Sequence, residues 1–502
     1  MVDRQLRRRR SPMMAAAFAL ALALALPAAS LGTSRYPNPP DAYVTLTNGG
    51  TVIPLINSGD EFDGETFEGL PDGLGVVPVG QGKRYVDLYV AFEQSTVPFR
   101  NSADFEDSSV QRAQLDLKTM EIKKLDEVLP ASAGFIRFCS AFMAGPEHGF
   151  DNYTFFVNEE SNDQLARPLG QAGYAVALDT KTGSYGAIPG MGRHNHENSV
   201  VVPGGWGEIA MLSGDDTFNA PSSQMYLYTA PTDDAVIADQ GTLWAFQVTA
   251  TESGTAIDAT DPFNGANDYG DMTKDDVWSG EFIRVPDAVA DGGQDGLEAW
   301  SNENNVFQFI RVEDIATDDH DPRVVYFADT GEARALTDAQ WTALSPNNVA
   351  SGRLHRGPSS GPFGNFGNGR IFKFVMNADD PRVVDEFSIF QDADTVAADG
   401  QSFIRHPDNV DTSASSLMVQ EDTSNAKIWR YDFGLDSWSI VASVNDPSGE
   451  SSGIIDMSKW LGAGWWALDV QAHGTNVESE TIGDVTYKRE DGQLLLMQIP
   501  GS

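Results

Sequence analysis

The sequence predicts an all-β fold, a β-propeller of about six blades with loop insertions. A short apolar run that ends in acidic or amide residues recurs at five places, which are residues 154–161, 209–216, 324–330, 417–423 and 465–471. A polar turn and a second strand pattern follow each run. The spacings from 155 to 209 and from 417 to 465 are near the roughly 40–50 residues of a four-stranded blade. A pair of β-sandwiches is the alternative fold for such short strands.

The first 30 residues have the pattern of a signal peptide. Arg7–Arg10 form a basic segment, Met13–Leu26 an apolar segment, and Pro27–Ser30 a small-residue cleavage site. The apolar segment is too short to span a membrane, and no other stretch of the chain is long and apolar enough. We therefore expect export to the periplasm or the extracellular space, by the Sec or the twin-arginine (Tat) route, without stable membrane insertion.

The remaining chain divides into a lead-in and one domain. Residues 31–80, which are rich in Gly, Pro and Asn, predict an irregular N-terminal lead-in, and residues 81–502 predict a single β-propeller domain. Tyr85–Phe92 is the first strong strand pattern, and residues 252–300 predict a loop insertion. No long helical pattern interrupts the strands, and the 48 glycines and 26 prolines indicate many turns.

The composition restricts the partners and the compartment. The formal net charge is −40, which argues against nucleic acid and anionic membranes as partners because both would repel the chain. The acids either form a solvated surface or in part bind Ca²⁺. Cys139 is the single cysteine, so an internal disulfide is excluded. Its apolar surroundings suit a buried structural thiol, and a nucleophilic or soft-metal-binding thiol is the alternative.

Acidic strand ends are the main candidates for a functional site. Glu159 and Glu160 directly follow the apolar run Thr154–Val157. Carboxylates are rarely buried unless they are paired or bind a cation. In a propeller the ends of the inner strands surround a central funnel, so we expect these acids to converge there on metal ions.

Three further stretches carry candidate ligands. His194, His196 and Glu197 precede an apolar strand and could bind a metal, or form a hydrogen-bonded turn. Arg311 and Glu313 lie two residues apart in a strand pattern, where a guanidinium beside a metal-binding carboxylate suits a phosphate site, and a surface ion pair is the alternative. The third stretch offers hard oxygen ligands for Ca²⁺ from neighbouring turns, at Asp408, Asn409, Glu421 and Asp422.

The motifs of several common enzyme classes are absent from the sequence. It contains no phosphate-binding Gly-Lys-Thr loop, no His-Glu-x-x-His and no Cys-x-x-Cys. Hydride transfer therefore has no support.

Four stretches, taken in order, resemble the PhoX-type alkaline phosphatase family. They read Phe-Cys-Ser-Ala with Asn-Glu-Glu-Ser, Gly-Arg-x-x-His-Glu-Asn, Phe-x-Arg-x-Glu-Asp with Phe-Ala-Asp-Thr-Gly, and Pro-Asp-Asn with Glu-Asp. The closing Gln-Ala-His473 is also similar, so the resemblance spans about residues 130–475. It implies a six-bladed propeller in which calcium ions and a pair of irons hydrolyse small phosphate monoesters.

The resemblance also implies roles for individual residues. Arg311 would contact the phosphate and stabilise developing charge. His196 is a candidate metal ligand, or a neighbour of one, from its own sequence pattern and not from the resemblance. The cluster ligands would be Glu159 or Glu160, Glu197, Glu313, Asp408, Asn409, Glu421 and Asp422. Asn158 stands where the family usually has an iron-binding Cys. An amide oxygen suits Ca²⁺ and holds Fe³⁺ poorly, so Ca²⁺ has the stronger support of the two cofactors.

Three hypotheses for the function follow. The first is an exported, metal-dependent phosphatase that acts on phosphate esters at a multi-metal cluster in the propeller funnel. The second is a calcium-stabilised, catalytically inactive propeller that serves as a binding or surface module. The third is a propeller hydrolase for another ester, such as a lactone or a sulfate.

Overall fold

The computed structural model describes residues 41–500 except 63, 81–83, 94–107, 162–171, 218–222, 262–263, 332–367, 394–402 and 483–484. The chain divides into two units, Met1–Asn38 and Pro39–Ser502, and all described residues belong to the second. The expected signal peptide, residues 1–30, lies outside the described residues. No helix in the described part of the chain is long and apolar enough to cross a membrane.

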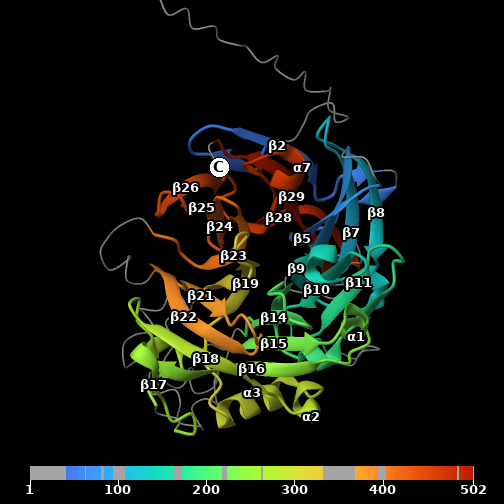
Figure 1. Cartoon of the computed structure of the whole chain (residues 1–502). Helices are drawn as coiled ribbons and strands as arrows, with labels where there is room; N and C mark the ends of the chain where they lie inside the picture. The colour runs from blue at the N-terminus through green and yellow to red at the C-terminus, as the bar shows by residue number, and fades with distance from the viewer. Residues whose placement is uncertain are drawn as a thin grey trace, which may run out of the picture. The chain divides into compact units, whose positions relative to one another are not determined.

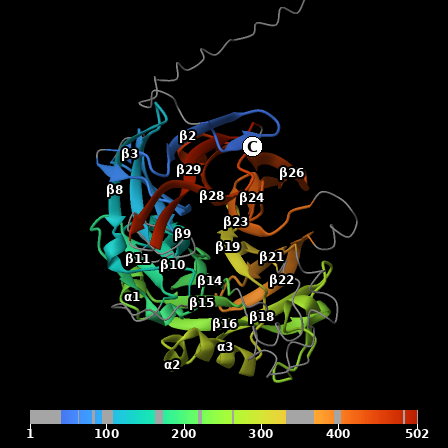
Figure 2. The ribbon, with the colours of Figure 1, turned by 180° about the vertical axis from the view of Figure 1, so that it is seen from behind.

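The second unit is a β-propeller, as the sequence predicts, with six antiparallel blades (Figure 1). Each blade begins with an inner strand, and neighbouring inner strands contact one another around the whole ring. Figure 2 shows the same ring from behind. The first three blades consist of β5 (Pro71–Pro78), β6 (Tyr85–Phe92), β7 (Ser109–Asp116) and β8 (Glu121–Leu129); β9 (Phe138–Ala144), β10 (Thr154–Glu159), β11 (Ala175–Asp179) and β12 (Tyr185–Ala187); and β13 (His196–Val201), β14 (Ile209–Asp215), β15 (Met225–Ala230) and β16 (Thr242–Thr251).

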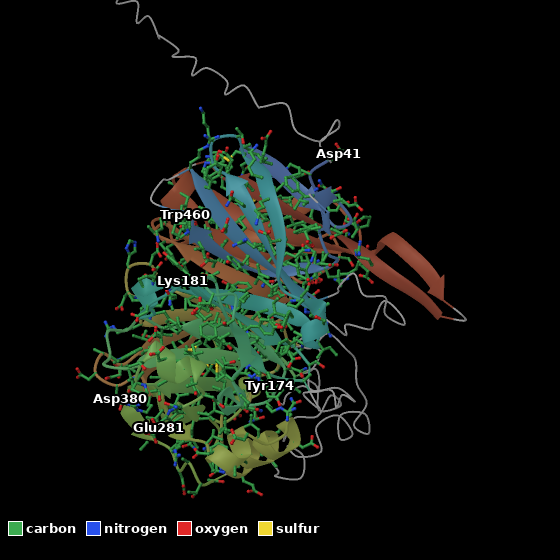
Figure 3. All side chains as sticks on the ribbon, turned by 90° about the vertical axis from the view of Figure 1, so that its right-hand side faces the viewer. Asp41, Tyr174, Lys181, Glu281, Asp380 and Trp460 are labelled. Atoms are coloured by element: carbon green, nitrogen blue, oxygen red, sulfur yellow. The ribbon has the colours of Figure 1, made fainter. Side chains whose placement is uncertain are left out.

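The last three blades follow the same plan. They consist of β19 (Val312–Thr317), β20 (Val324–Asp329), β21 (Arg370–Met376) and β22 (Val383–Asp392); β23 (Pro407–Ser413), β24 (Ser416–Glu421), β25 (Lys427–Asp432) and β26 (Ser437–Val444); and β27 (Gly449–Asp456), β28 (Trp465–Ile482) and β29 (Val485–Gln498). Strands β28 and β29 form a long hairpin that projects beyond the neighbouring strands (Figure 3).

An inserted segment links the third and fourth blades. Strand β18 (Val277–Arg284) pairs with β16 on one side and with β22 on the other, so the two blades form one sheet. The segment also contains the short strand β17 (Thr255–Ala256) and the helices α2 (Asp287–Ala290) and α3 (Gln294–Glu303). The other two described α-helices outside it are α1 (Asp233–Ile237) and α7 (Ser458–Leu461).

The expectation of an irregular lead-in over residues 31–80 is corrected for its described part. Strand β1 (Val44–Leu46) pairs with β26 of the fifth blade, and β2 (Thr51–Asn57) pairs with β29 as the outer strand of the sixth. A small hairpin, β3 (Glu61–Phe62) and β4 (Glu65–Thr66), follows before β5 opens the first blade. The turn residues separate short strands, and two of these strands, β1 and β2, gain their partners from the far end of the chain.

Apolar strand runs arise because the strands near the axis are buried on both faces. In β10, Phe156 packs toward the third blade while Phe155 and Val157 pack toward the first. A strand covered on both faces has a nearly continuous apolar run instead of alternation. The described core contains one apolar cluster at each of the six interfaces between blades, so the ring is closed by packing as well as by strand pairing.

Candidate metal centre

The two innermost strands of every blade share one register at one end of the propeller axis. The first residue of each inner strand pairs with an equivalent residue of the next strand: Pro71 with Phe92, Phe138 with Glu159, His196 with Asp215, Val312 with Asp329, Pro407 with Glu421 and Gly449 with Ala472. The six blades can therefore be compared position by position.

The second residue of each inner strand forms what we call the first ring. It consists of five carboxylates and one thiol: Asp72, Cys139, Glu197, Glu313, Asp408 and Glu450. In the first five blades the strand register shifts between the first and the fourth residue of the inner strand, the stretch that contains this residue. Such β-bulges re-aim side chains at functional sites. The chain thus repeats one local device to place an acidic or sulfur ligand near the axis.

The residue after the paired position of the second strand forms the second ring. Its members are Glu93, Glu160, Asp216, Thr330, Asp422 and His473. Atoms of the two rings approach closely, because three triplets each offer one ligand atom within 4.8 Å of the others. The triplets are Asp72, Glu93 and Cys139; Cys139, Glu160 and Glu197; and Glu197, Asp216 and Glu313. They share members and therefore form one continuous cluster.

Two arginines lie at the edge of the rings, each one residue before an inner strand. The Arg311 guanidinium donates two hydrogen bonds to Asp216, at 2.7 Å and 2.6 Å, and lies 3.2 Å from Glu313. The Nε of Arg137 lies 3.1 Å from both Glu93 and Glu160. Two guanidinium groups that touch the acids from different blades are placed to meet an anion that approaches the cluster.

The electrostatics of the rings favour the binding of cations. Burial, followed by the charge of Glu160, raises the pKa of Glu197 well above its usual value. Burial and Asp216 do the same to the pKa of Glu313, and burial and Glu197 to that of Asp408. Like charges in a poorly solvated site favour protonation unless cations offset them. Oε2 of Glu197 and Oδ1 of Asp72 also have no hydrogen-bond partner among the described residues. These donors fit a group of cations.

Cys139 belongs to the cluster, so the structure favours the metal-ligand interpretation of this thiol over a purely structural one. Its Sγ lies 3.2 Å from Oδ2 of Asp72, and it is grouped with Glu160 and Glu197. Burial and the neighbouring Asp72 raise its pKa well above the ordinary value of a thiol. A thiolate at this place therefore needs a metal ion, and sulfur ligands favour a softer metal than Ca²⁺.

Asn158 stands outside the rings, which changes the argument about iron. Its side-chain nitrogen donates to the backbone carbonyls of Ser140 and Glu197, at 3.3 Å and 3.2 Å. The amide thus joins the second blade to the third. Cys139 offers a sulfur atom to the cluster in its place, so Asn158 alone does not argue against an iron site.

Glu159 and Glu421, expected as metal ligands, are not brought to the cluster. The Glu159 carboxylate accepts from the backbone N–H groups of Ile136, at 2.9 Å, and Tyr174, at 3.1 Å. The Glu421 carboxylate accepts from the backbone N–H of Arg405 at 3.0 Å. Asp329 accepts equivalently from Ile310. These acids hold the loop that leads into the inner strand of their own blade, which suits a structural role.

The remaining candidates also separate into two groups. The candidates that lie in the rings are Glu160, Glu197, Glu313, Asp408 and Asp422, and the charge of Arg311 acts on three of them, Glu160, Glu313 and Asp422.

His196 and Asn409 do not lie in the rings. Both ring nitrogens of His196 have protein partners, Ser213 at 2.8 Å and the carbonyl of Gly192 at 3.0 Å. Asn409 donates to Ser140, which in turn donates to Glu197. Asn409 therefore holds Glu197 of the first ring in place through Ser140.

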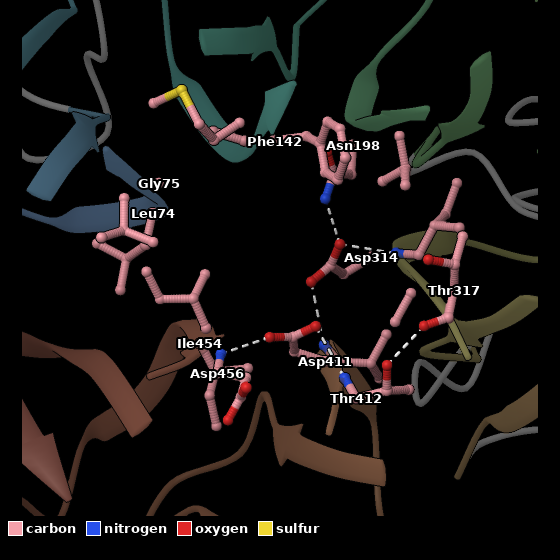
Figure 4. Close-up of a pocket in the computed structure, with 18 of the residues that line it drawn as sticks. Leu74, Gly75, Phe142, Asn198, Asp314, Thr317, Asp411, Thr412, Ile454 and Asp456 are labelled. Atoms are coloured by element: carbon pink, nitrogen blue, oxygen red, sulfur yellow. Dashed lines mark hydrogen bonds between the residues drawn. The ribbon is translucent and has the colours of Figure 1, made fainter. Parts of the chain in front are cut away.

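The opposite end of the axis holds a separate cavity of about 250 Å³ (Figure 4). All six inner strands line it, and its lining includes Asn198 and Asp314, which are hydrogen-bonded to each other. Asp411, which also lines it, accepts from the backbone N–H of Asp456. The polar layer that contains Asn198, Asp314 and Asn409 thus lies between this cavity and the acidic rings.

Sequence reasoning missed several members of the rings. Asp216 was visible, because it ends the run 209–216 in the same doublet pattern as Glu159–Glu160 and Glu421–Asp422. In all three doublets the second acid reaches the rings. Asp72, Glu93 and Glu450 follow no such doublet, and only the structure brings them to the axis.

Fold and site together define a six-bladed β-propeller with a candidate multi-cation centre at one end of its axis. No protein-family model matches the chain, and no curated protein sequence matches it. The structure is similar to a solved structure described as Pseudomonas fluorescens PhoX in complex with vanadate, a transition state analogue. The TM-score is 0.58, with 13% sequence identity over 91% of this chain and 96% of that chain. At this identity the likeness establishes the shared propeller fold.

Proposed function

We propose that the chain is an exported, metal-dependent phosphatase that hydrolyses small phosphate esters at the two acidic rings. One observation carries the proposal: a ring of carboxylates and one thiol, with an arginine bound to its acids, lies at one end of the axis of a propeller. The similar PhoX structure, which was solved with a vanadate transition-state analogue, supports phosphoryl transfer as the chemistry.

The donor atoms suggest which cations the site would take. We propose Ca²⁺ for the part made only of carboxylates, which includes Glu313, Asp408 and Asp422, because Ca²⁺ prefers several oxygen ligands. We propose iron for the part that contains Cys139, with Glu160 and Glu197 as its nearest acids. Bound cations would neutralise the phosphate oxygens and so lower the barrier to attack on phosphorus.

The residues of the chain would hold and orient the substrate. A guanidinium grips phosphate with two parallel N–H donors, and Arg311 already presents such a pair to Asp216. Arg311 would exchange part of this contact for phosphate oxygens and stabilise the charge that develops on them. Asp216 and Glu313 would keep its guanidinium in place beside the cluster.

An assay with aryl phosphates, with and without added Ca²⁺ and iron, tests the proposed activity. Arg311→Ala should lower kcat by about 10²–10³-fold, the usual effect of removing one donor to a developing anion. Arg323→Ala is the matched control, because Arg323 pairs with Asp321 in the connection between β19 and β20 of the same blade. It should leave the rate unchanged.

The same assay separates the competing functions. If no phosphate ester is hydrolysed in any metal mixture while Ca²⁺ still raises the thermal midpoint, the chain is a calcium-stabilised binding module. Turnover of a lactone or a sulfate ester without phosphatase activity would also refute the proposal. Export is tested separately by fractionation, in which the chain without residues 1–30 should stay in the cytoplasm.

A further inference from the structure

Asp469 in β28 occupies a position that is apolar in every other blade. Three residues before the paired position, the second strands of the first five blades carry Tyr89, Phe156, Leu212, Tyr326 and Met418, all of them buried. The equivalent residue of the sixth blade is Asp469, which is 0% exposed. A carboxylate in place of a core side chain is costly unless something compensates it.

The side chain of Asp469 faces the interface between the sixth and the first blade. Successive residues of a strand alternate between its two faces. Ala467 packs into the apolar cluster of this interface, and Gln471 donates to Asp72 and Glu93 of the first blade. Asp469 lies between them in the alternation. Asp469 pairs with Ser452, and the next residue, Gly453, lies against the backbone of Asp72. Burial and the charge of Asp72 raise the pKa of Asp469 well above its usual value.

Three side chains at this place have oxygens without partners. Both carboxylate oxygens of Asp469, Oδ1 of Asp72 and Oε1 of Gln471 are buried and accept no hydrogen bond from any described residue. A proton on Asp469 could be shared with only one of the neighbouring oxygens, so at least two of these four oxygens would still lack a partner. The adjoining donors of Gln471 and Cys139 are both directed at the other oxygen of Asp72.

We propose that Asp469, Asp72 and Gln471 bind a further divalent cation of the calcium type, behind the two rings and between the first and last blades. All of the donors are hard oxygens, which are the ligands that Ca²⁺ prefers, and no sulfur or imidazole is among them. Carboxylates of two blades would share the cation, so it would join the two ends of the blade series. This site is structural, and it stands whether or not the chain is a phosphatase.

The experiment compares the full chain with Asp469→Met, which copies the residue of the fifth blade, and with Asp469→Asn, which keeps the size. Each protein is equilibrated with CaCl₂, freed of unbound ions and analysed for bound calcium. Thermal midpoints are measured in calcium and in chelator. Asp116→Asn is the control, because Asp116 is a buried carboxylate that pairs with Arg84 on the outer part of the first blade.

The proposal predicts the loss of one equivalent of calcium in both Asp469 variants, with a smaller rise of the thermal midpoint on calcium addition. In chelator, Asp469→Met should be at least as stable as the unmodified chain, because it removes an unpaired buried carboxylate. The control should lose stability equally in calcium and in chelator and keep its calcium. Unchanged calcium content in a folded Asp469 variant would overturn the proposal and leave a buried water as the partner of Asp469. The readout is calcium content, so absent phosphatase activity would refute only the proposed function.

Discussion

Glu421 and Asp422, at the end of β24, should respond differently when each is replaced by its amide. The first replacement should lower the stability of the chain, and the second should lower its metal content. Glu421 accepts hydrogen bonds from the backbone N–H groups of Arg405 and Lys427 and from the indole of Trp429, at 2.9–3.0 Å. Asp422 lies in the second ring beside Glu450. The first acid therefore belongs to the scaffold and the second to the candidate metal centre.

The magnitudes follow from these contacts. In Glu421→Gln, the amide NH₂ replaces an acceptor and leaves one buried N–H without a partner, which costs about 1–3 kcal/mol. The other hydrogen bonds lose their charge assistance, so we expect a total of about 2–4 kcal/mol. Asp422→Asn should change the stability of the metal-free chain by less than about 1 kcal/mol, because it removes a charge from an acidic cluster without creating a cavity.

Denaturant unfolding in calcium and in chelator, together with metal analysis, measures both effects. Glu421→Gln should lose stability in both solutions and retain its metal content once folded. Asp422→Asn should lose bound metal and most of the stabilisation by calcium, since an ion stabilises only the state that binds it. The assignment of the two acids is refuted if Glu421→Gln loses metal while folded, or if Asp422→Asn retains all of it.

Three further predictions concern other parts of the molecule. Cys139→Ser should bind calcium like the unmodified chain and lose iron, because a hydroxyl is a poor replacement for a thiolate, and absorption spectroscopy with metal analysis would show it. Phe387→Ala should destabilise the chain by about 3–5 kcal/mol in denaturant unfolding, because Phe387 is fully buried and contacts several aromatic rings of the core. Burial lowers the pKa of His148 to about 4, so the unfolded chain binds a proton between pH 4 and 6.5 that the folded chain does not. Stability should therefore fall by up to about 3 kcal/mol as the pH drops through this range, and His148→Gln should reduce the fall.

The fold could be predicted because its signal is repeated. Strands buried on both faces give apolar runs, and five such runs with acidic ends were enough to indicate a propeller. Strands β1, β2 and β5 were missed. The partners of β1 and β2 lie far away in the sequence, and β5 is rich in glycine and proline.

The site was only partly predictable, because side-chain direction changes with every residue of a strand. From the sequence, Glu159 and Glu160 are equivalent candidates. The strand register sends the first to the backbone of the preceding loop and the second to the axis. Glu450 follows a glycine and has no apolar run before it, so no local pattern marks it.

Because β1 and β2 pair with strands near the C-terminus, the fifth and sixth blades can fold fully only after nearly the whole chain has been synthesised. Tyr43, next to β1, donates its backbone N–H to Gln493, which lies 450 residues further along the chain. At a synthesis rate of about 5–20 residues per second, the first strands wait roughly 20–90 s for their partners. Exposed strand edges invite wrong pairing during such an interval. Pro54, at the irregularity of β2, cannot donate a backbone hydrogen bond and so makes this strand a poor template for foreign strands.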